Sequence, residues 1–105
     1  MRDAKAAALR YQDIFGKGNF FLELQDHGIP AQQVVNQELL RMHEETGIDL
    51  VATNDVHYTK AEDAAPHDIL LCLQTNKKLA DEDRMRYEGG QYYVKSPEEM
   101  AQLFP

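Results

Sequence analysis

The sequence has little cysteine and no long apolar run. Cys72 is the only cysteine in 105 residues, which excludes an internal disulfide and predicts a reducing, cytoplasmic setting. It lies in the apolar segment "ILLCLQ", where we expect a buried and inert thiol. No stretch approaches the roughly 18 apolar residues of a membrane span, and the first residues lack the apolar core of a signal peptide. We therefore expect a soluble protein with no membrane partner.

Basic residues are also scarce. The chain has 11 Lys and Arg residues and 18 Asp and Glu residues, which gives a formal net charge of −7. A surface that binds nucleic acid by neutralising phosphates is expected to be basic. The densest basic group is interrupted by the acidic residues 81–83 and consists of Lys77, Lys78, Arg84 and Arg86. We expect the chain by itself to bind DNA weakly. Its acidity fits a metal site, because carboxylates are ligands for hard cations, and fits a solvated acidic surface equally well.

The first half of the chain predicts two strands joined by a helix. The expected elements are a helix over 4–15, a strand over 19–25, a helix over 30–46 and a strand over 48–54. Both strands are almost continuously apolar, which is typical of a parallel sheet covered on both faces. Two parallel strands do not form a stable sheet alone. We therefore expect a piece of a larger α/β protein, with further strands upstream.

A further helix is expected after the second strand. Thr59 and Glu62 have the spacing of a capping box that opens it. Pro66 then either lies in the first turn of a helix that begins near residue 65, or kinks the helix. The segment "HDILLCLQ" continues as an apolar helical segment in both cases.

The last part of the chain is more polar. Residues 75–91 carry two adjacent glycines and predict an irregular surface segment, and "YYV" predicts a short strand. Ser96 has the position of an N-cap, with Pro97 at the first helical position and Glu99 closing a capping box. These signals predict a final helix from residue 97.

Polar side chains gather where the two predicted strands end. They are Glu23, Gln25, Asp26 and His27 for the first strand, and Asn54, Asp55 and His57 for the second. In parallel α/β folds the carboxyl ends of the strands carry the functional groups. Asp55 and His57 are two residues apart, so an extended segment directs both to one face. A carboxylate beside an imidazole could hold a divalent cation, although a catalytic zinc takes three protein ligands. The alternative is that Asp55 caps a turn and His57 faces solvent.

The other candidates are individual residues. Glu23 lies within an apolar strand, where an unpaired carboxylate is costly, so we expect it to be paired or near a metal. We expect His27 to be a loop residue, and His43 to be solvated on an exposed helical face. His67, beside Asp68, either supports a metal ligand through a hydrogen bond or belongs to the surface. Asn54 is a second candidate for such a supporting role.

Three segments carry a resemblance to a known family. "FFLELQDHGIP", "VATNDVHYTKAEDAAPHDILLCLQT" and "GGQYYVKSPEEMAQLF" closely resemble, in that order, the later part of the polymerase-and-histidinol-phosphatase (PHP) domain of bacterial DNA polymerase III alpha subunits. The resemblance covers about residues 6–104. It implies a distorted, seven-stranded, TIM-like β/α barrel, of which this chain supplies the last strands and helices. Residues 1–76 would be the C-terminal portion of the PHP domain, and 77–105 the connection toward the polymerase body.

The resemblance also implies a metal site. In the family, a cluster of divalent ions (zinc, manganese or magnesium) is held at the strand ends by histidines and carboxylates from all along the domain. The last two ligands are an Asp-x-His pair, which falls on Asp55 and His57. The family's opening His-x-His motif and its middle ligands have no counterpart here, so the site would be incomplete. Glu23 matches a recurrent strand glutamate and is the one candidate catalytic residue.

The implied function belongs to a larger parent protein. The parent would be the catalytic alpha subunit of a bacterial replicase, a DNA-directed DNA polymerase that uses DNA and dNTPs and works with other replicase subunits. Its PHP module would be a metal-dependent phosphoesterase, either a 3′→5′ exonuclease or a pyrophosphatase, and the isolated fragment would be inactive. One alternative is a non-catalytic scaffold that stabilises the polymerase and docks partner subunits. Another is a free-standing PHP phosphatase, which the polymerase-like "GGQYYVKSPEEMAQLF" disfavours.

Overall fold

The computed structural model describes residues 2–105. These residues form two compact units, the first ending at Thr53 and the second running from Asn54 to Pro105. Each unit is described by itself. The division predicted at residue 76 concerns a longer polypeptide and stays a prediction.

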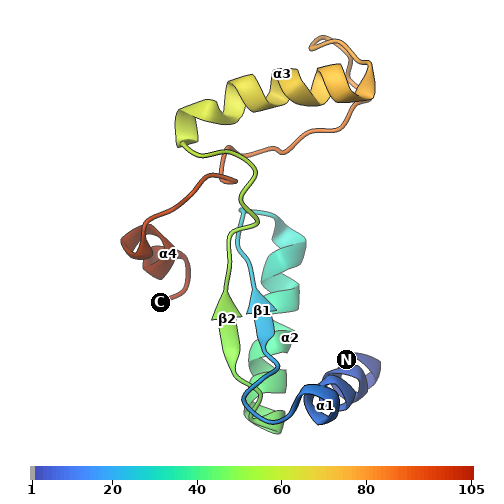
Figure 1. Cartoon of the computed structure of the whole chain (residues 1–105), viewed down its shortest axis with the longest axis vertical. Helices are drawn as coiled ribbons and strands as arrows, with labels where there is room; N and C mark the ends of the chain where they lie inside the picture. Colours follow the sequence, from blue (N-terminus) through green and yellow to red (C-terminus); the bar gives the residue numbers. More distant parts are fainter. Residues whose placement is uncertain (1) are drawn as a thin grey trace. The chain divides into compact units, whose positions relative to one another are not determined.

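The first unit is a strand–helix–strand arrangement preceded by a helix (Figure 1). Its elements are α1 (Arg2–Phe15), β1 (Leu22–Leu24), α2 (Pro30–Thr46) and β2 (Leu50–Ala52). The two strands pair in parallel, with Leu22 opposite Leu50 and Leu24 opposite Ala52. Parallel neighbours need a crossover connection, and α2 supplies it. The predicted order of elements and the parallel pairing are confirmed.

Local signals set the ends of α2. Ile29 is extended before the helix, and Pro30 occupies the first turn, where its missing N–H leaves no hydrogen bond unmade. Gly47 ends the helix in the left-handed conformation, with φ of 75°, and its N–H donates to the His43 carbonyl at 2.8 Å. Glycine adopts this conformation without a Cβ penalty, which is why the helix stops there.

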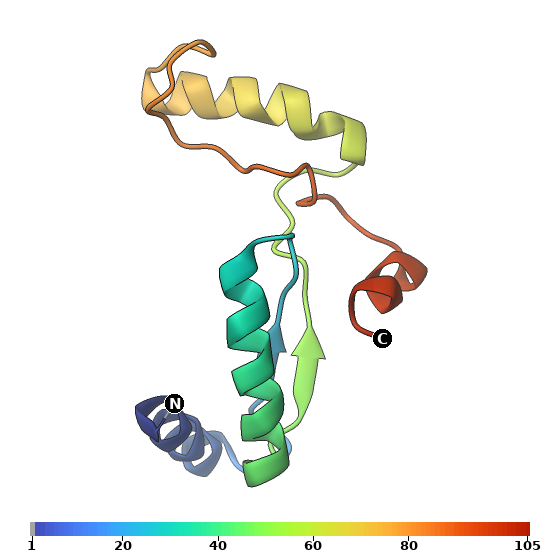
Figure 2. The same cartoon turned by 180° about the vertical axis from the view of Figure 1, so that it is seen from behind.

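A small core joins the elements of the first unit. Its buried members are Ala8, Leu22, Met42 and Ile48, with Phe20, Leu39 and Leu50 packed against them. Figures 1 and 2 show α2 lying along one face of the strand pair. Leu22 and Leu24 are buried while Glu23 between them is exposed, because alternate residues of a strand face opposite sides.

The prediction of two long, buried strands is wrong for the described residues. Each strand has three residues, and Val51 and Phe21 are 41% and 47% exposed. The reason is that each strand has one hydrogen-bonded neighbour and one covered face. Apolar side chains outside the covered face, such as those of Val51 and Phe21, therefore stay partly exposed.

The second unit holds a 3₁₀ turn and two helices. They are η1 (Ala61–Asp63), α3 (Ala64–Thr75) and α4 (Pro97–Leu103). Pro66 lies in the first turn of α3, as one of the two sequence alternatives predicted. The expected capping box of Thr59 and Glu62 is one residue off, since the Lys60 N–H donates to Asp63 Oδ2 at 3.0 Å. The Ser96 cap is confirmed, because its Oγ accepts from the Glu99 N–H at 3.2 Å.

Residues 54–59 run beside residues 91–95 within this unit. The His57 N–H donates to the Tyr92 carbonyl at 2.8 Å, and the Val94 N–H donates to the Thr59 carbonyl at 3.1 Å. Tyr58 and Tyr93 form an isolated parallel bridge. The strand expected at "YYV" is therefore a single bridge.

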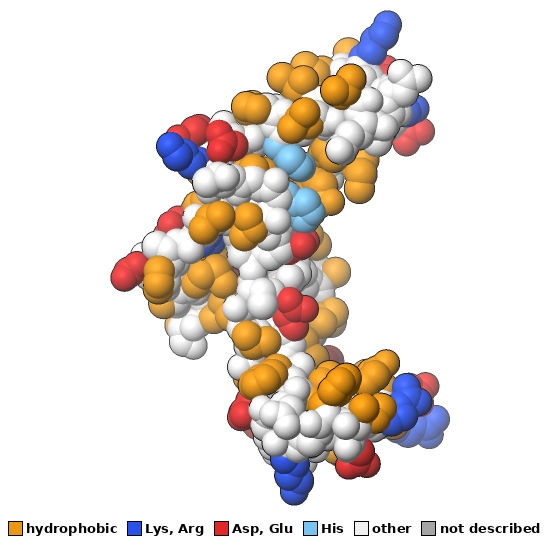
Figure 3. Space-filling model, in the orientation of Figure 1, with side chains coloured by type: hydrophobic (Ala, Val, Ile, Leu, Met, Phe, Trp, Pro, Cys, Tyr) orange, Lys and Arg blue, Asp and Glu red, His pale blue; other side chains and the backbone are white. Residues whose placement is uncertain are grey.

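Much apolar surface of α3 is exposed. Cys72 and Leu71 are buried, as expected for the thiol, but Ile69, Leu70 and Leu73 are 55%, 54% and 77% exposed. Figure 3 shows hydrophobic side chains exposed along this helix. None of the helices among residues 2–105 is both long enough and apolar enough to cross a membrane.

These surfaces predict that the isolated 105-residue chain is marginally stable or self-associates. Exposed apolar side chains and unpaired strand edges favour contact between copies. Sedimentation velocity and thermal unfolding in dilute solution measure this directly. A sharp cooperative transition in a strictly monomeric sample would contradict the prediction.

Candidate metal centre

The backbone turns sharply after β2, at Asp55. Its φ is +51°, in the left-handed region that few non-glycine residues occupy. Aspartate tolerates this conformation because its short polar side chain forms local hydrogen bonds. The prediction of an extended segment through Asp55 and His57 is therefore wrong.

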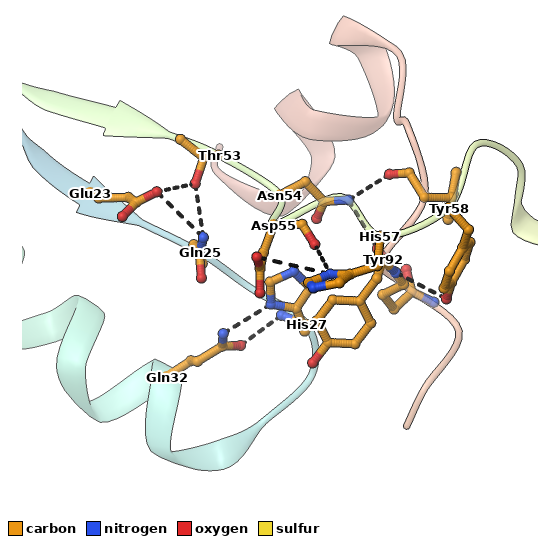
Figure 4. Close-up of polar contacts among 12 residues, drawn as sticks. Glu23, Gln25, His27, Gln32, Thr53, Asn54, Asp55, His57, Tyr58 and Tyr92 are labelled. Atoms are coloured by element: carbon orange, nitrogen blue, oxygen red, sulfur yellow. Dashed lines mark hydrogen bonds and ion pairs between the residues drawn. The ribbon is translucent and has the colours of Figure 1, made fainter. Parts of the chain in front are cut away.

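The turn nevertheless brings the two predicted ligands together (Figure 4). His57 Nδ1 lies 2.7 Å from the backbone oxygen of Asp55 and 3.9 Å from its carboxylate Oδ1. A carbonyl oxygen only accepts hydrogen bonds, so Nδ1 carries a proton and donates it. The neutral imidazole then has its lone pair on Nε2, the atom that can bind a metal. The Asp55 side chain is 50% exposed and the His57 side chain 29%.

Asn54 holds the backbone around this pair. It is 8% exposed, and its amide nitrogen donates to the carbonyl oxygens of Gln91 at 2.9 Å and Tyr93 at 2.7 Å. The bonds fix residues 91–93 beside the turn, where the Tyr92 carbonyl accepts from the His57 N–H. Asn54 therefore supports the backbone that carries His57, and its support of a bound metal stays a prediction.

Aromatic rings surround the His57 imidazole. Its centroid lies 4.2 Å from the ring of Tyr87, 5.8 Å from Tyr92 and 6.0 Å from His67. The His67 ring is also 5.4 Å from Tyr87 and 5.2 Å from Tyr58. We call His57 and these four rings the aromatic cluster. Burial raises the pKa of the Tyr92 hydroxyl, and the nearby Asp55 carboxylate adds to the shift. The sequence analysis missed Tyr87 and Tyr92, because no spacing relates them to His57.

Asp68 binds Arg84 across the second unit. The guanidinium and the carboxylate form two bonds, Nη1 to Oδ1 at 2.6 Å and Nη2 to Oδ2 at 2.8 Å, and the Arg84 side chain is 3% exposed. This bidentate pair fixes the irregular segment 77–91 on α3. The same bond lowers the pKa of Asp68 below its ordinary value. The segment is irregular as expected, but Arg84 is not a surface residue.

Glu23 is paired, which is one of the two expected outcomes. Its Oε1 accepts from Thr53 Oγ1 at 2.5 Å and from Gln25 Nε2 at 3.4 Å. The carboxylate lies on the exposed side of β1, so the burial that made pairing necessary does not apply. It lines a pocket of about 220 Å³ with Gln25, Ala31, Gln32, Val35 and Asn36.

The remaining histidines have structural partners. His27 lies in a loop as predicted but is 4% exposed, and its Nδ1 is 2.9 Å from Gln32 Nε2. Its own N–H donates to Gln32 Oε1, which orients that amide so that Nε2 donates to the ring. The prediction that His43 is solvated is wrong. The ring is half-buried because Nδ1 donates to the Ile48 carbonyl at 2.6 Å, beyond the end of α2.

The described residues supply an incomplete ligand set. Between residues 2 and 105, no group of three or more His, Cys, Asp or Glu side chains is placed to hold a metal ion. The Asp55–His57 pair offers one carboxylate and one imidazole. Any further ligands would have to come from outside this set.

Comparison with known proteins identifies the family. No family model matches the chain. Its relatives are proteins named DNA polymerase III subunit alpha: it is 49% identical over 102 residues to that of Saccharopolyspora erythraea, 47% over 103 residues to that of Deinococcus radiodurans and 46% over 101 residues to that of Campylobacter jejuni. The chain is homologous to one segment of the DNA polymerase III alpha subunit. The alignments cover 96–98% of this chain, which spans about 8% of the length of these curated relatives.

The resemblance to alpha subunits that the sequence predicted is thus confirmed, while the PHP barrel stays a prediction. Within this alpha-subunit segment, the basic group does not form a continuous cationic surface. Arg84 forms an ion pair with Asp68, and Arg86 Nη2 donates to the Asp81 carbonyl at 2.9 Å. The two arginines therefore hold the loop together.

We expect the isolated alpha-subunit segment to bind single-stranded or primed DNA only at weak, non-specific levels at physiological salt. The reason is that few of its cationic side chains are available to displace the counterions of the DNA phosphates. Fluorescence anisotropy over a range of salt concentrations measures the affinity and its salt slope. Micromolar or tighter binding with a steep slope would place DNA contacts in this segment.

The Asp68–Arg84 pair predicts how firmly residues 77–91 are held. Because folding lowers the Asp68 pKa, the pair stabilises the fold above the ordinary aspartate pKa, and this contribution is lost as the pH falls through the lowered value. Asp68→Asn in the full-length alpha subunit should therefore speed hydrogen–deuterium exchange in peptides covering 77–91 at neutral pH. Asp83→Asn, which changes an exposed carboxylate of the same loop, should not. Equal exchange in both variants would show that the pair does not anchor the loop.

Proposed function

We propose that this chain is the last part of the PHP module in the catalytic alpha subunit of a bacterial replicase. The module would be a seven-stranded, distorted β/α barrel, with β1 and β2 among its last strands. The observation that carries the proposal is the Asp55–His57 pair. It lies directly after β2 in a chain homologous to alpha subunits, with His57 Nδ1 3.9 Å from Asp55 Oδ1. Functional groups of parallel α/β folds lie at such strand ends.

The donor atoms of the pair fit a divalent ion. Asp55 offers carboxylate oxygens, and the proton on Nδ1 leaves the His57 Nε2 lone pair for coordination. Imidazole suits zinc, and carboxylate oxygen suits magnesium and manganese. The mixed pair therefore fits Zn²⁺ or Mn²⁺ and would bind Mg²⁺ more weakly. Bound divalent ions would generate hydroxide and stabilise the leaving oxygen in phosphoester hydrolysis. Asp55 and His57 would hold and orient them.

The proposed activities are those of the parent polypeptide. It would transfer nucleotides from dNTPs to a primer end, in the cytoplasm and together with other replicase subunits. The PHP module would add phosphoester hydrolysis, as a 3′→5′ exonuclease or a pyrophosphatase. Glu23, paired with Thr53 and Gln25, has no contact that assigns it a catalytic role. The isolated chain would be inactive because it offers two metal ligands.

A scaffold is the second candidate function. The exposed apolar face of α3, formed by Ile69, Leu70 and Leu73, favours packing against other protein surface. In this reading the module stabilises the polymerase and docks partner subunits without chemistry. A free-standing phosphatase is disfavoured, because residues 77–105 are included in the matches to alpha subunits.

Substitution of the ligand pair separates these functions. In the full-length alpha subunit, Asp55→Asn or His57→Ala should lower the metal content and abolish exonuclease or pyrophosphatase activity, since each removes a ligand. Primer extension should persist, because its residues lie elsewhere. Asp13→Asn, an exposed carboxylate of α1, is the matched control. The measurements are elemental analysis of the purified proteins and paired hydrolysis and primer-extension assays.

The outcomes are distinct. Unchanged metal content in both ligand variants would remove Asp55 and His57 from the metal site. Full metal occupancy of the wild-type protein without hydrolysis of DNA or pyrophosphate would instead support the scaffold.

A further inference from the structure

The irregular segment 77–91 brings an aromatic ring onto His57. The Tyr87 ring lies 4.2 Å from the imidazole centroid, with an angle of 34° between the planes. This is the shortest of the ring contacts that His57 makes in the aromatic cluster. Tyr87 is half-buried and also contacts His67 at 5.4 Å and Tyr92 at 5.1 Å.

Tyr87 is held in this position from two sides. Three residues earlier, Arg84 forms the bidentate bond to Asp68 and is almost fully buried. On the other side, Tyr92 is buried in the segment that the Asn54 amide fixes. The position of the Tyr87 ring therefore depends on anchors outside the turn that carries His57.

The Tyr87 ring restricts a rotation of the His57 imidazole that the hydrogen bond from Nδ1 leaves open. The bond from Nδ1 to the Asp55 carbonyl fixes the tautomer and one edge of the imidazole. It does not by itself fix the ring plane. Tyr87 covers one face of the ring, and Tyr92 meets it at 79°. Together they set the direction in which the Nε2 lone pair points, and a metal ligand needs a defined direction.

We propose that Tyr87 is a positioning residue for His57 in the metal site of the alpha subunit. This inference rests on the proposed function, since it concerns the same ligand pair. The aromatic ring of Tyr87 positions the imidazole, because the contact is between the two rings. Its hydroxyl is dispensable.

The test compares Tyr87→Leu with Tyr87→Phe in the full-length alpha subunit. Tyr11→Leu is the matched control, because Tyr11 stacks on Phe20 at 5.5 Å in the first unit and takes no part in the ligand pair. The first measurement is the rate at which diethyl pyrocarbonate modifies His57 in metal-free protein, followed by peptide mass spectrometry with His43 as the internal reference. The second is Mn²⁺ affinity by equilibrium dialysis, together with the visible absorption spectrum of added Co²⁺.

Tyr87→Leu should speed modification of His57, change the Co²⁺ spectrum and weaken Mn²⁺ binding by about tenfold, as loss of a group that supports a ligand typically does. Tyr87→Phe and Tyr11→Leu should match the wild type in all three measurements. Circular dichroism checks the fold of each variant. If Tyr87→Leu fails to fold, Tyr87→Met gives the same comparison, because its flexible apolar chain fills the space without a ring.

Failure of this inference and failure of the proposed function look different. Weak Mn²⁺ binding by His57→Ala, with wild-type binding and spectrum in Tyr87→Leu, would overturn the role of Tyr87 and leave the metal site in place. Wild-type binding by His57→Ala would overturn both. Equal losses in Tyr87→Leu and Tyr87→Phe would assign the effect to the hydroxyl and overturn the ring contact.

Discussion

The buried amide of Asn54 joins the two segments on which the candidate metal centre is built. One nitrogen donates to two carbonyl oxygens, of Gln91 and Tyr93, that lie 37 and 39 positions further along the chain. Burying an amide is unfavourable unless its hydrogen bonds are made. Here they are made only when residues 91–93 lie beside the turn. The placement of Tyr92, and of the His57 N–H that bonds to its carbonyl, follows from that requirement.

A second long-range constraint acts on the segment between them. Residues 77–91 have few apolar side chains and no regular structure, so little in them resists unfolding. The Arg84–Asp68 pair compensates, because a bidentate bond with an almost fully buried guanidinium is geometrically specific. The loop is thereby ordered by charge pairing and aromatic contact, whereas the first unit is ordered by a small apolar core around Ile48.

Sequence reasoning succeeded where a signal is local. Pro30, Gly47 and the Ser96 cap fix helix ends within a few residues, and the apolar strands around α2 indicate parallel pairing. It failed where the outcome depends on distant partners. The left-handed turn at Asp55 and the ring of Tyr87 on His57 have no spacing rule, and the exposure of β2 depends on neighbours that the described residues do not supply. The Asp55–His57 pair was found, but by an extended geometry that the turn replaces.

Asp55 performs two tasks with different parts of the residue. Its carboxylate is the candidate ligand, while its backbone carbonyl selects the His57 tautomer. The backbone carbonyl is retained in every substitution that preserves the left-handed turn. Asparagine and glycine at this position would therefore keep the His57 tautomer with its proton on Nδ1. A β-branched residue disfavours that conformation and would disturb both tasks at once. Sequence variation at position 55 is thus constrained by conformation as well as by charge.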